Sequence, residues 1–190
     1  MEKLNLIKKP DDRIWVSGRV YDIDMRLITV MRFIYLLADT RVEPYLKVDQ
    51  GLKLLIKTNL RDADINDKIE AFNALKEKVS GEGLYLKDRQ GRLLKGENGQ
   101  PIPAEQGERR TDYIEDFEYI YAGFIQAYQI DLYDKQDMDW RKFKALLKSL
   151  PKTTFYREVI EIRSLDTSEL TGSNLKKAIE AKRAYELKGG

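Results

Sequence analysis

Four aspartates that lie close together are the residues of this sequence best suited to hold a cation: Asp131, Asp134, Asp137 and Asp139. An EF-hand calcium loop needs acidic ligands at alternate positions, a glycine at its sharp turn and a glutamate at its end. The spacing of these aspartates does not fit that pattern. We therefore interpret Asp137 or Asp139 as a helix cap, and the sequence predicts no metal-binding residue.

The residue types present give little support for an enzymatic active site. Glu115 and Glu118 lie about one helical turn apart and could share acid–base work, but no nucleophile accompanies them, so we interpret them as a polar helix face. The chain has no histidine and no cysteine, which excludes Ser/His dyads, thiolate nucleophiles and cysteine-based zinc sites. Its glycines match neither G-x-G-x-x-G nor the Walker pattern. We expect no catalytic residue, no cofactor and no enzymatic activity.

A basic helix face is the strongest candidate for binding. Arg141, Lys144 and Lys148 share one face of a predicted helix. Three interpretations stay open: a solvated surface, a contact with an acidic protein partner, and a surface that follows nucleic acid phosphates. The solvated surface is favoured because the nearby aromatic residues follow the apolar period, and the three cations are kept as candidate partner-binding residues.

Charge is balanced overall but separated locally. The chain has 34 basic and 32 acidic residues, so its total charge does not favour or exclude nucleic acid. Residues 141–163 are mainly basic and residues 108–118 mainly acidic. Such asymmetry suits complementary contacts between helices or between copies of the protein.

The pattern of apolar residues predicts one mostly α-helical domain over residues 1–190, a bundle of about six to seven helices. We expect a β-hairpin at 14–23, helices one to three within 25–80, and helices four to seven within 111–187. Residues 81–110 are rich in glycine and are predicted to be a flexible insertion that could close a second hairpin. No apolar run reaches the length of a membrane span and no signal peptide is evident, so we expect a cytoplasmic protein.

Several local expectations can be checked directly. We expect the hairpin to pack through Trp15, Val20 or Tyr21, and Asp24 to be the N-cap of a helix over roughly 25–39. A fourth helix is predicted at about 112–129, where apolar residues on two sides favour a central position. Residues 138–166 predict a helix, a corner at Pro151 and a second helix. The apolar period places these residues in the core: Trp140, Phe143, Leu147, Leu150, Phe155, Val159 and Ile162.

Part of the chain resembles a known family. The segments DFEYIYAGFIQAYQIDL (116–132), DWRKFKALLKSLP (139–151) and R-S-L-D (163–166) are similar to the gene-product-fifteen family of tailed phages and prophages of Gram-positive bacteria. VSGRVYDIDMRLITVMRF (16–33) is similar to that family's hairpin and first helix. Several members have two adjacent aromatic residues where this chain has Trp140 and Arg141, and the insertion at 81–110 has no counterpart.

The resemblance implies a noncatalytic role in tail morphogenesis, as a tail-assembly chaperone that binds the tape-measure protein and helps tube subunits assemble. It further implies self-association, action in the host bacterial cytoplasm, and absence from the mature virion. Two alternatives stay open: a structural tail or connector subunit retained in the virion, and a nucleic-acid-binding phage regulator.

Overall fold

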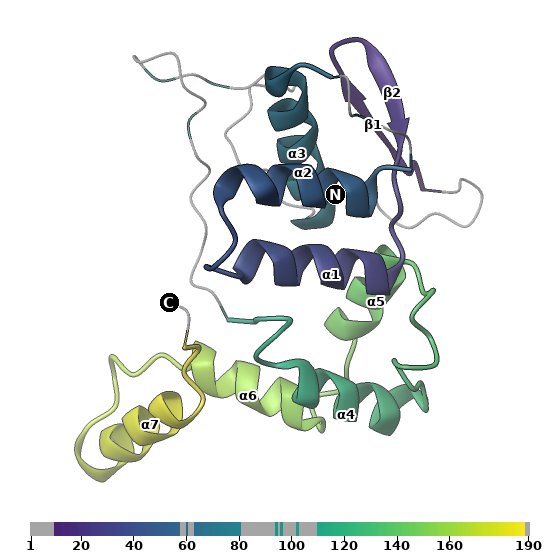
Figure 1. Ribbon diagram of the computed structural model, residues 1–190. Helices are drawn as coiled ribbons and strands as arrows, with labels where there is room; N and C mark the ends of the chain where they lie inside the picture. The colour runs from purple at the N-terminus through teal and green to yellow at the C-terminus, as the bar shows by residue number, and fades with distance from the viewer. Residues whose placement is uncertain are drawn as a thin grey trace. The chain divides into compact units, whose positions relative to one another are not determined.

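The computed structural model describes residues 10–57, 60, 63–80, 94, 96, 102 and 110–188. These residues form seven helices and one two-stranded sheet (Figure 1). The prediction of a mostly α-helical fold with a small N-terminal hairpin is therefore confirmed. The predicted insertion at 81–110, with its second hairpin, lies almost entirely outside the described residues.

Backbone contacts divide the chain into two compact units. Unit 1 comprises Met1–Glu105 and Asp137–Phe143, and unit 2 comprises Gln106–Gln136 and Lys144–Gly190. The predicted single domain over 1–190 stays a prediction.

Unit 1 contains the hairpin and three helices. Its elements are β1 (Arg13–Val16), β2 (Arg19–Asp22), α1 (Leu27–Ala38), α2 (Pro44–Leu55) and α3 (Ile65–Ser80). In Figure 1, α1 and α2 lie side by side, and α3 contacts both α2 and β1. Proline at the first position of α2 fits the start of a helix, because its missing N–H would have no intrahelical partner there.

The hairpin packs through the face that carries Ile14 and Val16. The prediction that it packs through Trp15, Val20 or Tyr21 is therefore wrong in part. Ile14 and Val16 are buried, whereas Trp15 is 65% exposed and lies opposite Val20, which is also exposed. Side chains alternate between the faces of a strand, so burying the aliphatic pair of β1 turns Trp15 outward. The turn requires positive φ at Ser17 (47°) and Gly18 (76°), which glycine adopts without steric cost.

The first helix begins later than expected, and Asp24 is not its N-cap. Asp24 donates its backbone N–H to Leu55 O (2.7 Å), and Met25 O accepts from Trp140 N (2.8 Å). These bonds hold the chain extended until α1 begins at Leu27. The Asp24 carboxylate instead accepts hydrogen bonds from the Arg26 backbone and side chain and from Thr29 Oγ1 (3.0 Å).

The indole of Trp140 lies in the core of unit 1. Trp140 and Phe143 are each 1% exposed, and their rings stack with centroids 5.2 Å apart. The indole Nε1–H donates to Val79 O at the end of α3 (2.8 Å), so the polar atom of this side chain is satisfied in the core. The start of α5 (Trp140–Lys148) therefore belongs to the packing of unit 1.

Unit 2 contains the remaining helices. Besides the rest of α5 they are α4 (Phe117–Tyr128), α6 (Phe155–Ser164) and α7 (Gly172–Ala184). Helix α6 contacts both α4 and α7 (Figure 1). Leu147 and Leu150 are buried as predicted, and Gly123 of α4 allows close approach, because a Cβ there would lie 3.0 Å from Leu150 Cδ1.

Two expectations for unit 2 are wrong in detail. Tyr156, not Phe155, joins Val159 in the core: the Tyr156 hydroxyl lies 3.1 Å from Thr111 Oγ1, whereas Phe155 is 43% exposed. Helix α4 is not covered on two sides: Ile120 and Phe124 are fully buried, but Ile125 is exposed.

The close packing around Gly51 can be tested by substitution. A Cβ at Gly51 would lie 2.7 Å from ring atoms of both Phe33 and Phe72. We expect Gly51→Ala to lower the free energy of unfolding by about 1–3 kcal/mol, the usual cost of overpacking a core, although alanine in an open helix is favourable. Urea denaturation measures the difference. The exposed neighbour Gln50 supplies the control, since Gln50→Ala should change stability by no more than about 0.5 kcal/mol. A gain in stability from Gly51→Ala would contradict the packing.

Acid should weaken unit 1 through Asp24. The side-chain hydrogen bond from Arg26 lowers the pKa of Asp24 to about 2. A carboxyl with a lowered native pKa stabilises the fold above its unfolded pKa of about 4 and loses this contribution as pH falls towards the native value. We expect Asp24→Asn to be less stable than wild type above pH ~4 and the difference to shrink towards pH ~2. Urea titrations across this range test it, and a difference independent of pH would contradict it.

Candidate functional site

The three candidate partner-binding cations have different surroundings. Arg141 is buried in unit 1, with 7% of its side chain exposed, whereas Lys148 in unit 2 is exposed and Lys144 is half-buried. Binding of a partner by these residues stays a prediction. Of the three, Lys148 is the most accessible to such a partner.

The buried Arg141 pairs with two aspartates that are themselves partly exposed. Its Nη2 pairs with Asp12 Oδ1 and Asp139 Oδ2, and its Nε donates to Asp139 Oδ1 (3.0 Å). Burial alone would lower the pKa of Arg141, but the hydrogen bonds to Asp139 and Asp12 outweigh it and raise the pKa. The Arg141 guanidinium thus has a packing role within unit 1.

A second buried ion pair organises unit 2. Arg163 donates from Nη1 and Nη2 to the two carboxylate oxygens of Asp116, both at 2.8 Å. Its Nε donates to Tyr185 O (2.6 Å) and its Nη1 to Arg110 O (3.0 Å). The Asp116 side chain is 1% exposed and that of Arg163 10%. One guanidinium therefore joins α6, the start of α4 and the end of α7.

The rest of the R-S-L-D motif stabilises the path from α6 to α7. Leu165 O accepts from Lys182 Nζ (3.0 Å). Asp166 Oδ1 accepts from the Ser168 N–H (2.9 Å), and hydrogen bonds from Ser168 lower the pKa of Asp166. The motif therefore gives three hydrogen-bonded anchors along this segment, two through side chains and one through a backbone carbonyl.

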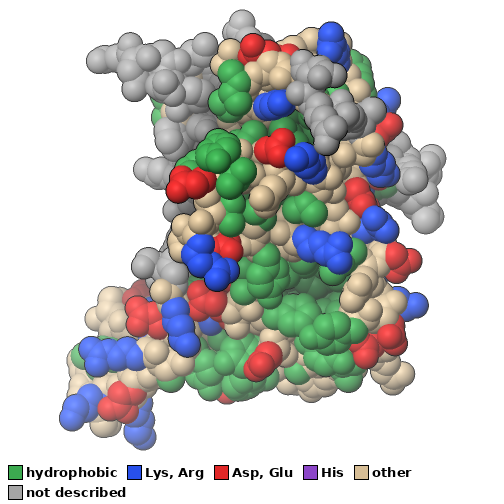
Figure 2. Space-filling view, viewed as in Figure 1, with side chains coloured by type: hydrophobic (Ala, Val, Ile, Leu, Met, Phe, Trp, Pro, Cys, Tyr) green, Lys and Arg blue, Asp and Glu red, His purple; other side chains and the backbone are tan. Residues whose placement is uncertain are grey.

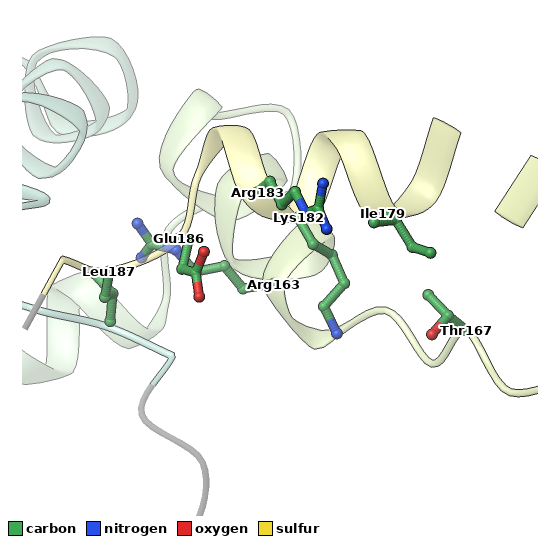
Figure 3. A pocket seen from close by; sticks show the side chains of 7 residues that line it. All are labelled: Arg163, Thr167, Ile179, Lys182, Arg183, Glu186 and Leu187. Atoms are coloured by element: carbon green, nitrogen blue, oxygen red, sulfur yellow. The ribbon is translucent and has the colours of Figure 1, made fainter. Parts of the chain in front are cut away.

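A hollow of about 350 Å³ lies between the start of this segment and α7. Figure 3 shows Arg163, Lys182 and Arg183 along its wall, together with Glu186 and apolar side chains. Arg163 and Lys182 already donate to partners within unit 2. These two cations thus contribute to the packing of α7, so we do not assign them to an anion-binding site in the hollow.

The acidic residues act on nearby backbone groups. Asp131 Oδ1 accepts from the Tyr133 N–H (2.8 Å), and Asp139 Oδ1 accepts from the Arg141 N–H (2.8 Å), as expected of a residue at the start of a helix. Glu115 Oε2 accepts from the Lys188 N–H (2.8 Å). No group of three or more potential metal ligands occurs within the part of the chain that the structure describes.

An aromatic surface on unit 2 was not predicted. Phe117, Tyr121 and Tyr133, which we call the aromatic surface, contact one another with ring centroids 5.4–6.3 Å apart. Figure 2 shows apolar side chains gathered over α4, with acidic side chains at their margin. The sequence offers one signal for it, an aromatic residue inside the polar turn at 131–139.

These two units define a mostly helical protein in which buried ion pairs and aromatic residues organise the packing. A family model described as "Bacteriophage Gp15 protein" matches residues 11–187. The chain belongs to this family of phage proteins, as the resemblance indicated. No curated protein and no solved structure matches the chain. Among the described residues, no helix has the length and apolar character needed to span a bilayer.

The Arg163–Asp116 pair should be essential to unit 2. We expect Arg163→Ala to lower the free energy of unfolding by roughly 3–5 kcal/mol, because it leaves a carboxylate buried without its partner. Thermal and urea denaturation measure the loss.

Arg183 provides a matched control on α7, where it is exposed, and Arg183→Ala should cost no more than about 0.5 kcal/mol. The double variant Arg163→Met with Asp116→Leu should recover part of the loss, because it removes both charges together but still lacks the hydrogen bonds to Tyr185 O and Arg110 O. A loss below about 1 kcal/mol for Arg163→Ala would contradict the role of the pair.

Proposed function

We propose that this chain is a noncatalytic tail-morphogenesis protein, a tail-assembly chaperone that binds the tape-measure protein in the host cytoplasm. Membership of the Bacteriophage Gp15 protein family over residues 11–187 carries the proposal. The resemblance to that family implies this role, together with help in assembling tube subunits, self-association and absence from the mature virion.

Exposed apolar side chains on both units support a protein-binding role. A chaperone for a long apolar chain must offer apolar surface to it, and large exposed apolar patches mark interaction sites. Unit 1 exposes Trp15 and Tyr45, and unit 2 exposes Tyr133, Ile125 and Phe155. Aromatic side chains are favoured at protein interfaces because they contribute much contact area.

A nucleic-acid regulator gains less support than a chaperone from the basic face. Arg141, one of its three cations, is committed to Asp12 and Asp139 within unit 1. A phosphate could displace these carboxylates only by breaking both ion pairs of an arginine whose side chain is 7% exposed.

Co-expression tests the proposal. We expect the soluble yield of the neighbouring tape-measure protein to rise several-fold when this chain is produced with it, because binding covers apolar surface that would otherwise aggregate, and we expect the two proteins to co-purify. An unrelated aggregation-prone protein serves as the control and should gain nothing. An unchanged yield without co-purification would refute the chaperone role.

Mass spectrometry of purified particles separates the chaperone from a structural tail or connector subunit. A chaperone acts during assembly and should be missing from mature virions. Stoichiometric amounts of this chain in the particle would favour the structural subunit instead.

A further inference from the structure

The aromatic surface of unit 2 is arranged as a platform for a ligand. Tyr133 is 62% exposed, whereas Phe117 and Tyr121 are half-buried beneath the same surface. Tyr133 meets Phe117 edge to face with centroids 6.0 Å apart, and meets Tyr121 at 5.4 Å. Ile125 lies one helical turn beyond Tyr121 on α4 and is also exposed. A side chain of a partner therefore has a ring face and an aliphatic neighbour to pack against.

Asp131 holds this platform in place. Its Oδ1 accepts the backbone N–H of Tyr133 (2.8 Å) and its Oδ2 accepts the Tyr121 hydroxyl (3.2 Å). One carboxylate thus fixes both the turn that carries Tyr133 and the ring beside it. A pre-positioned ring loses little conformational entropy when a ligand binds.

Two carboxylates, those of Asp131 and Asp134, lie near the aromatic surface. Burial raises the pKa of the Tyr121 hydroxyl, and the neighbouring charges of Asp131 and Asp134 raise it further. Neither carboxylate forms an ion pair with another described side chain. The faces of aromatic rings are themselves negative, so rings and carboxylates attract the same kind of ligand.

A cation on a long aliphatic stem fits this chemistry. An arginine stacks its guanidinium on an aromatic ring and pairs with a carboxylate, while its stem covers apolar surface. A nucleic acid backbone would meet repulsion from Asp131 and Asp134.

We propose that the aromatic surface binds an arginine or lysine of a protein partner, and that this basic residue lies between apolar residues of the partner. The site consists of Phe117, Tyr121 and Tyr133 with the carboxylates of Asp131 and Asp134. The inference rests on the proposed function, in which this partner is the tape-measure protein. The basic residue then determines which segment of the apolar tape-measure protein is bound, because apolar contacts alone do not distinguish one apolar segment from another.

Overlapping synthetic peptides that cover the neighbouring tape-measure protein provide the probe, with binding to the full chain measured by fluorescence anisotropy. We expect the bound peptides to contain arginine or lysine beside apolar residues. Tyr133→Ala and Asp134→Asn should each weaken binding roughly fivefold, the size of one cation–π or partly exposed charge contact. Tyr133→Phe should retain binding, because the ring and not the hydroxyl makes the contact, and added salt should weaken it.

Tyr35→Ala is the matched control, since Tyr35 of unit 1 is also an exposed tyrosine, 50%. Circular dichroism confirms that each variant folds, and the exposed Asp134→Asn change removes charge without removing packing. Two results would overturn this inference and leave the proposed function unaffected. One is peptide binding that is unchanged by both Tyr133→Ala and Asp134→Asn. The other is binding that is unchanged when the basic residue of the peptide is replaced by glutamate. If wild type binds neither the peptides nor the intact tape-measure protein, the proposed function fails and the inference fails with it.

Discussion

The packing of unit 1 depends on a segment, Met138 to Trp140, that begins 100 residues beyond the end of α1 at Ala38. Met138 O accepts from the Leu27 N–H (2.7 Å), and the Trp140 N–H donates to Met25 O (2.8 Å). The Trp140 indole then donates to Val79 O at the end of α3 (2.8 Å). Each of these bonds satisfies a polar group that would otherwise lose water without compensation. The start of α1, the end of α3 and the first turn of α5 are therefore stabilised together.

Buried charge has a comparable role in both units. Arg141 pairs with Asp12 and Asp139 in unit 1, and Arg163 pairs with Asp116 in unit 2. Part of the local charge separation seen in the sequence is thus satisfied inside the protein. Both arginines donate more than one hydrogen bond to carboxylates, and Arg163 also donates to backbone oxygens. Lysine could not replace either arginine without losing hydrogen bonds. Of the three cations on the basic helix face, Lys148 is exposed, Lys144 is half-buried and Arg141 is buried.

Local sequence signals predicted most of the secondary structure. The hairpin at 14–23 and the corner at Pro151 each depend on backbone geometry that neighbouring residues determine. The spacing of Trp140, Phe143, Leu147 and Leu150 also identified the buried face of α5 correctly. A 3.6-residue period identifies one face of a helix whatever that face packs against, so burial could be read here without knowing the neighbours.

By itself, the sequence determined the helical class of this protein, its N-terminal hairpin and its family, because these depend on local period, turn residues and short motifs. Tertiary structure decided which of two adjacent candidates became buried. In the hairpin, Ile14 and Val16 are buried and Trp15 is exposed. In α6, Tyr156 is buried and Phe155 is exposed, and Thr111 provides a hydrogen-bond partner for the Tyr156 hydroxyl. Tertiary structure also placed Tyr133 beside Phe117 and Tyr121. Contacts between residues distant in sequence leave no periodic signal, so the aromatic surface could be recognised only once the chain was folded.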